Sequence, residues 1–157
     1  MITKEMLEKS DLFGDLKIFQ WQELTKVARE KEFKAGDVIF KEGDASTELY
    51  MVVEGEVEIT LKVAPQLADT PVYKVKPFDI FGEFAFVDPK PRSASAWCSS
   101  KAVLAVITKG DFEELTKKFP RIGLNFYRSL VNLLSDRLRR MNDYLRDTFV
   151  RCAGLEI

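Results

Sequence analysis

The period of the apolar residues changes twice along the chain, and each change predicts a different kind of secondary structure. From residue 3 to about residue 30, apolar residues recur at steps of three and four, as they do in short helices. From Phe33 to Ile107 the period is two, and glycines and prolines interrupt it at short intervals, which is typical of short strands. From Thr108 onward the helical period returns.

These periods predict a mainly β fold with flanking helices, in which a small antiparallel β-barrel or jelly roll carries N-terminal helices and a long C-terminal helix. At 157 residues one core is expected. We therefore predict a single domain over residues 1–157, with N-terminal helices at 1–32, the barrel at 33–107 and C-terminal helices at 108–150. In the clearest strand, four apolar side chains share a face that we expect to be buried: Val57, Ile59, Leu61 and Val63.

One stretch inside the barrel zone does not fit a strand. Residues 81–87, with the sequence FGEFAFV, lack polar alternation, and prolines follow at positions 89 and 91. This pattern predicts a single helical turn and then a rigid loop, set into the barrel wall. Such conflicts between local pattern and overall fold often mark functional sites, so residues 81–97 are the candidate site segment.

Two helices are expected after the barrel. Thr108 can cap a short helix that runs to about Lys118, and Pro120 fits the first turn of a long helix from Arg121 to about Val150. The long helix carries a stripe with coiled-coil spacing, which predicts a homodimer seam: Leu124, Tyr127, Val131, Leu134, Leu138, Met141 and Leu145.

A second apolar row on the long helix is shorter: Ile122, Phe126, Leu130 and Leu133. Because this row stops early, we expect the first half of the helix to pack against both the barrel and a partner. The second half would then keep only the partner. The alternative is that the longer stripe lies on the chain's own barrel.

The composition removes several classes of function. The chain contains no histidine, which excludes hydrolases built on imidazole and metal centres ligated by histidine. Two cysteines, Cys98 and Cys152, are too few for an iron–sulfur or zinc site, so we expect no metal and ordinary thiols in a reducing, cytoplasmic compartment. No apolar run is long enough to span a bilayer, and no membrane partner is expected. An enzyme is the least favoured class, with Glu83 and Asp79 as the remaining acid–base candidates.

Charge is distributed unevenly, although the net charge is only −1. The segment from Arg121 to Arg151 has seven arginines and three aspartates, whereas residues 1–120 carry 17 basic and 21 acidic side chains. Such a run is typical of a solvated helix face, and contact with an acidic partner is the alternative. No base-reading element accompanies the run, so no direct binding of nucleic acid is expected.

Residues 82–94 have the composition of a site for a phosphate beside a sugar. A helix that begins at a glycine offers free backbone N–H groups, and Gly82 lets an anion approach closely. The guanidinium of Arg92 and the hydroxyl of Ser93 can converge on the same anion. Glu83 cannot bind a phosphate, but it can accept a hydrogen bond from a sugar hydroxyl. The alternative is an internal ion pair of Glu83 with Arg92, an arrangement that rarely gains stability.

The segment FGEFA, followed by PRSA, resembles the phosphate-binding cassette of the cyclic nucleotide-binding domain. This module is shared by bacterial catabolite activator proteins, regulatory subunits of cyclic-AMP-dependent kinase and cyclic-nucleotide-gated channels. Residues 33–44 and 49–58 resemble the first strands and glycine turns of the same family. The resemblance covers about residues 7–150. It implies a non-enzymatic receptor for a cyclic nucleotide.

The resemblance also implies roles for individual residues. Arg92 would pair with the cyclic phosphate, and Ser93 would add its hydroxyl. Glu83 and Gly82 would bind the ribose, with Glu83 accepting from its 2′-hydroxyl. The phosphate would also bind the amides around Gly82, Glu83, Phe84 and Ala94. The base would lie against Ile59, Leu61, Val72 and Val75, under one residue of the long helix, for which the candidates are Arg137, Met141 and Asn142. Serine, rather than threonine, after the arginine favours cyclic AMP (cAMP) over cyclic GMP (cGMP).

Two features depart from the family's pattern. Relatives usually have a glycine where this chain has Phe78, so the turn before the cassette must either avoid a positive φ or accept strain. Only seven residues follow Val150, too few for a helix-turn-helix domain. We therefore expect a stand-alone receptor domain that signals through its last helix to an unidentified effector protein. A ligand-free dimerisation or scaffold module on the same fold is the alternative.

Overall fold

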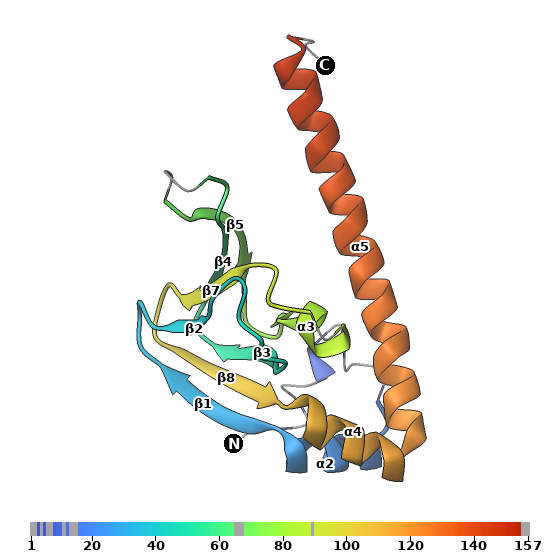
Figure 1. Ribbon diagram of the computed structural model, residues 1–157. Helices are drawn as coiled ribbons and strands as arrows, with labels where there is room; N and C mark the ends of the chain where they lie inside the picture. Colours follow the sequence, from blue (N-terminus) through green and yellow to red (C-terminus); the bar gives the residue numbers. More distant parts are fainter. Residues whose placement is uncertain are drawn as a thin grey trace.

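Two four-stranded antiparallel sheets form the barrel (Figure 1). The computed structural model describes residues 3, 5, 8–10, 12, 16–64, 68–88 and 90–154. In this part of the chain one sheet has the order β1-β8-β3-β6 and the other β2-β7-β4-β5. The strands are β1 (Arg29–Phe33), β2 (Val38–Phe40), β3 (Leu49–Glu54), β4 (Val57–Leu61), β5 (Thr70–Val75), β6 (Ile80–Phe81), β7 (Ser95–Cys98) and β8 (Ala102–Ile107).

Helices flank the barrel, and the expected mainly β fold with a long C-terminal helix is confirmed. They are α2 (Ile18–Val27), α3 (Glu83–Val87), α4 (Lys109–Lys118) and α5 (Pro120–Cys152). Thr108 caps α4 as expected, because its hydroxyl accepts a hydrogen bond from the Asp111 amide at 3.1 Å. Pro120 occupies the first turn of α5, also as expected.

Strands β3 and β8 are buried on both faces because they lie between two hydrophobic cores. Alternate β3 residues such as Tyr50 and Val52 point into the barrel. The residues between them, such as Met51, pack against the helices with Trp21 of α2 and Phe126 of α5. Each large apolar side chain buried in this way contributes about 1.5–3 kcal/mol. The helices are therefore fixed to the barrel through the back of β3 and β8.

The first strand begins earlier than the expected residue 33. Strand β1 lies within the range assigned to the N-terminal helices, and most of residues 1–15 of that range lie outside the described residues. The sequence of β1, REKEF, has no apolar alternation because four of its five side chains are exposed. Backbone pairing with β8 holds it at the sheet edge, where charged side chains discourage pairing with other chains.

The buried face expected for residues 57–63 is wrong in its second half. A register irregularity in the pairing with β5 separates Ile59 from Thr60. Beyond it Thr60 is buried, while Leu61 and Val63 are exposed. The extra residue of this bulge is Val72 of β5, because β4 keeps a regular register with β7 through Thr60. Leu61 and Val63 lie beyond Thr60, the last β4 residue that pairs with β7, so they are left uncovered at the end of the β4–β5 hairpin.

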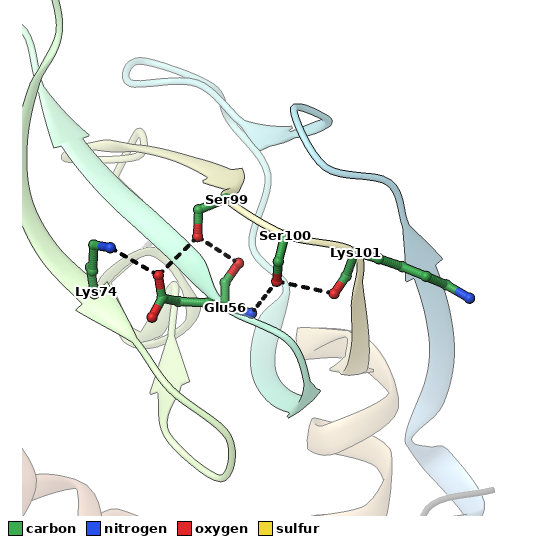
Figure 2. A network of polar contacts seen from close by, with 5 residues as sticks. All are labelled: Glu56, Lys74, Ser99, Ser100 and Lys101. Atoms are coloured by element: carbon green, nitrogen blue, oxygen red, sulfur yellow. Dashed lines mark hydrogen bonds and ion pairs between the residues drawn. The ribbon is translucent and has the colours of Figure 1, made fainter.

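A polar network joins the turns at one end of the barrel, as Figure 2 shows. The carboxylate of Glu56 accepts from Lys74 of β5 at 3.0 Å and from Ser99 at 3.1 Å, and the Glu56 amide donates to Ser100 at 3.0 Å. The hydrogen bond from Lys74, and then that from Ser99, lowers the pKa of Glu56. The network thus ties the turn before β4 to β5 and to the turn before β8.

Helix α5 runs well past the barrel (Figure 1). Its first half packs against its own chain as expected, because Ile122, Phe126 and Leu130 are buried in the core that contacts the helices, while packing against a partner stays a prediction. The residues from Leu138 to Phe149 are all exposed. In the described residues no helix is both long enough and apolar enough to cross a membrane.

Candidate functional site

Gly82 places the short helix α3 directly beside Arg92. It is the N-cap of α3 and has a φ of 78°, in the left-handed region that favours glycine. A Cβ atom here would lie 2.6 Å from Nη1 of Arg92 and 3.1 Å from the Glu48 carbonyl oxygen. The position therefore requires glycine both for its backbone conformation and for space.

The guanidinium of Arg92 is buried and held in one orientation. The residue is 3% exposed. Nη1 donates to the Gly82 carbonyl at 2.8 Å, Nη2 to the Glu48 carbonyl at 2.9 Å, and Nε to Ser46 Oγ at 2.9 Å. Its Cζ lies 4.1 Å from the centre of the Phe40 ring. These contacts fix the guanidinium next to the start of α3.

The positive charge of Arg92 is only loosely compensated. Burial lowers its pKa, against the opposing effects of Tyr50 and Glu48. The carboxylate of Glu48 is 3.4 Å from Nη2. A buried cation whose short hydrogen bonds go to neutral carbonyl and hydroxyl groups is costly even with carboxylates such as Asp44 and Glu83 nearby, and an anion in direct contact would offset that cost.

Glu83 has an ion-pair partner other than Arg92. Its buried carboxylate accepts a hydrogen bond through Oε1 from Nη1 of Arg137, which reaches the cassette from α5. Nη2 of Arg137 donates to the Ile80 carbonyl at 2.6 Å. The alternative of an internal pair between Glu83 and Arg92 is therefore wrong for this structure, because each of the two pairs with another residue.

The other expected phosphate ligands lie at the surface around this point. Ser93 is exposed and Ala94 half-buried, immediately after Arg92 and before β7. Phe84 is 54% exposed and lies in the first turn of α3. The structure thus places Gly82, Glu83, Phe84 and Arg92 together at the start of α3, with Phe84 exposed and both Glu83 and Arg92 buried.

The expected wall for the base is only partly present. Val75 is fully buried inside the barrel next to Val57, so solvent does not reach it in this structure, and its place in the base wall stays a prediction. Strand β5 turns Val75 inward there. Ile59 is half-buried, and Leu61 and Val72 are exposed on the β4–β5 hairpin.

Among the three candidates on α5, Arg137 contacts the cassette directly. Met141 and Asn142 are exposed one turn further along the helix. Seam residue Leu134 packs partly on the chain's own core. The other six seam residues are exposed: Leu124, Tyr127, Val131, Leu138, Met141 and Leu145.

The turn before the cassette accepts strain at Phe78, whose φ is 75°. Its amide donates to the Val52 carbonyl at 2.8 Å, and the next amide, that of Asp79, donates to the Lys76 carbonyl at 3.0 Å. Of the two outcomes left open for this position, the positive φ is the one observed.

Four residues around Arg92 were missed by reasoning from the sequence. Ser46 and Glu48 bind its guanidinium, and Phe40 and Tyr50 pack against it. All four precede Arg92 by more than 40 positions, and they lie in stretches whose pattern is that of ordinary strand and turn. Burial raises the pKa of Tyr50 to about 12, so the phenol stays neutral beside the guanidinium.

Two hollows on the surface differ in size, and the larger one does not lie at the cassette. The larger, of about 410 Å³, lies at the base of α5 and is lined by Phe19 and Leu124 rather than by cassette residues. A smaller one, of about 120 Å³, lies beside the cassette between Asp79 and Arg137. No group of three or more histidine, cysteine, aspartate or glutamate side chains in the described part of the chain is placed to hold a metal ion.

Comparisons with known proteins agree with this geometry. The sequence profile of the cyclic nucleotide-binding domain matches residues 30–119. The chain is 28% identical over 143 residues to a CRP-like cAMP-activated global transcriptional regulator of Mycobacterium tuberculosis, covering 91% of this chain and 62% of the regulator. It is 31% identical over 109 residues to a cAMP-dependent protein kinase regulatory subunit of Emericella nidulans, covering 69% of this chain and 26% of the subunit.

A solved structure extends the agreement to the fold. A cyclic nucleotide-binding domain from Methylobacillus flagellatus superposes with a TM-score of 0.81 at 26% identity, over 92% of this chain and 80% of that one. The chain matches less than two thirds of the length of each of the two relatives compared by sequence, the mycobacterial regulator and the fungal kinase subunit. The profile match covers more than half of the chain, and the chain belongs to the cyclic nucleotide-binding domain family.

Proposed function

We propose that this chain is a non-enzymatic receptor that binds a cyclic nucleotide, cAMP before cGMP, at the start of α3. The observation that carries the proposal is the buried, loosely compensated guanidinium of Arg92 beside the amides of Gly82 and Glu83. A cyclic phosphate supplies the missing anion, and it can accept hydrogen bonds from the guanidinium and these amides. Glu83 then accepts from the ribose 2′-hydroxyl.

The preference for cAMP rests on two supports. The names of the mycobacterial regulator and the fungal kinase subunit both refer to cAMP. Ser93 follows the cassette arginine at an exposed position, where its hydroxyl can reach a bound phosphate.

The signal would leave through α5, because Arg137 connects that helix to Glu83. We propose that α5 pairs with a second copy of the chain through its exposed seam and passes the signal to an effector protein. The seam has coiled-coil spacing, and its outer half is free of the barrel. The two free cysteines fit a reducing, cytoplasmic location.

Titration calorimetry with cAMP and cGMP tests the receptor. Wild-type protein should release or absorb heat, with the stronger binding for cAMP. Arg92→Lys keeps the charge but loses the planar fork, and Arg92→Leu loses both. Loss of one charge-assisted bond costs about 1.5–3 kcal/mol, so we expect Arg92→Lys to bind at least tenfold more weakly and Arg92→Leu not measurably.

Arg29→Leu is the matched control, since it removes an exposed arginine of β1 that pairs with Asp111 of α4 and that forms no ion pair with the cassette in the described part of the chain. It should bind like the wild type. Folding of each variant is checked by circular dichroism. Well-folded wild-type protein that gives no heat with either nucleotide would support the scaffold alternative instead.

A further inference from the structure

The side chain of Arg137 fills a position between the cassette and strand β5. Its guanidinium donates to the Glu83 carboxylate on one side and to the Ile80 carbonyl on another. Its Cζ also lies 5.7 Å from the centre of the Tyr73 ring. The planar cation therefore touches a carboxylate and faces an aromatic ring at the same time.

Tyr73 presents that ring from strand β5. It lies directly opposite Ile59 in the β4–β5 pairing, so the two side chains share one face of the sheet. The Tyr73 hydroxyl donates to Asp79 Oδ2 at 3.4 Å, which steadies the ring against the turn before the cassette.

We infer that Arg137 occupies the nucleoside subsite of the unliganded protein as a built-in competitor, and that Tyr73 is the face on which the base stacks. The inference rests on the proposed function. A nucleoside makes the same two kinds of contact as this guanidinium, because its ribose hydroxyl donates to a carboxylate and its planar base stacks on an aromatic ring. Both partners, Glu83 and Tyr73, are already engaged by Arg137.

The free space supports the competition. The hollow next to Arg137 measures about 120 Å³. Ligand pockets typically measure about 300–1,000 Å³, so this hollow, which Tyr73 and Arg137 both line, is too small for a nucleotide while Arg137 stays in place. Because Arg137 belongs to α5, its release also frees that helix from Glu83. Nucleotide binding and the position of α5 are thereby coupled, and the coupling works equally in both directions.

Calorimetry with cAMP tests the competitor through Arg137→Gln, which removes the cation but keeps a polar side chain. We expect this variant to bind cAMP about fivefold more tightly than the wild type, since no ion pair has to be broken first. The matched control is Arg139→Gln, which removes an exposed arginine of the same helix that pairs with Asp136. Its affinity should lie within twofold of the wild type.

The base-stacking face is tested by comparing Tyr73→Leu with Tyr73→Phe. Loss of a stacking ring costs at least about fivefold in affinity, so Tyr73→Leu should bind cAMP at least that much more weakly than Tyr73→Phe. Equal affinity of these two variants would overturn the role of Tyr73.

Hydrogen exchange gives a second readout, which does not depend on measuring a binding affinity. Amides of residues 131–140 should exchange faster in ligand-free Arg137→Gln than in Arg139→Gln, and cAMP should produce the same rise in the wild type. Weaker cAMP binding by Arg137→Gln, or unchanged exchange with intact binding, would overturn the competitor while leaving the receptor in place. Absence of cAMP and cGMP binding in the wild type and in Arg137→Gln would overturn the receptor itself, and the inference with it.

Discussion

Position 82 requires glycine for two reasons, its backbone conformation and the lack of space for a side chain. Its φ is positive, and the space where a Cβ would stand is taken by Nη1 of Arg92. Gly43 also has a positive φ, yet nothing lies within 4 Å of the position of its Cβ. Comparing alanine substitutions at these two glycines therefore separates the free-energy cost of backbone strain from the cost of close contact with Arg92.

Gly82→Ala should destabilise the protein more than Gly43→Ala does. Both variants pay about 1–2 kcal/mol for a left-handed alanine, and only Gly82→Ala must also displace the held guanidinium. Urea unfolding of the two variants measures the difference. Equal losses would show that Arg92 moves aside freely, and would weaken the case for a rigid cradle.

Phe78 stores strain that can be measured in the same way. Phe78→Gly and Phe78→Ala lose the same ring, but only alanine keeps the cost of the positive φ. We expect Phe78→Gly to be more stable than Phe78→Ala by about 1 kcal/mol. If alanine proves equal or better, the turn has relaxed to a negative φ in the variants.

Periodicity predicted the helices α4 and α5 well and the strands less well. The first turns of both helices carry explicit signals, namely the cap at Thr108 for α4 and the proline at 120 for α5. These signals depend on neighbouring residues alone. The bulge at Val72 of β5 and the pairing of β1 with β8 depend on partner strands elsewhere in the chain. Patterns within a single segment do not contain that information.

The same difference between local and long-range information explains which residues of the site could be predicted from the sequence and which could not. Gly82, Glu83 and Arg92 lie within ten positions of one another, and their chemistry could be read together. Glu48 and Ser46 reach Arg92 from the loop before β3, and Arg137 reaches Glu83 from α5. Arg137 was one of three equal candidates until the folded helix showed which of them faces the cassette.

The exposed seam of α5 predicts self-association. Leu138 is 59% exposed in the single chain, so Leu138→Glu should leave the barrel stable but oppose a coiled coil by placing a charge in its core. Sedimentation velocity should show a dimer for the wild type and a monomer for the variant. Asn132→Glu, at an exposed position off the seam, should remain dimeric. A wild-type monomer at every concentration would contradict the seam.

The buried core inside the barrel, which contains both Cys98 and Tyr50, makes the folded chain sensitive to alkali. Burial raises the pKa of Cys98 to about 11 and that of Tyr50 to about 12. Folding therefore favours the neutral thiol and phenol over their anions. Their contribution is complete below the unfolded pKa values, about 9 and 10, and is lost as the pH rises through the folded values.

Unfolding free energy should therefore fall between pH 8 and pH 11, by about 2 kcal/mol from Cys98 alone. Cys98→Ala should flatten the first part of that fall, which urea titrations at half-unit pH steps would show. Native protein at pH 8 should also present the exposed Cys152, and not Cys98, to a thiol reagent. Rapid reaction of both thiols would mean that the barrel core opens readily.

The length of α5 beyond Arg137 has a mechanical consequence. At 1.5 Å per residue, Arg137 lies about 26 Å from the start of the helix at Pro120, and Cys152 lies about 48 Å from it. If the helix pivots at Pro120 as a rigid rod, its tip moves almost twice as far as the point where Arg137 meets Glu83. A shift of about 3 Å at the cassette then becomes about 6 Å at the far end, a gain in stroke that comes only from the arm's geometry.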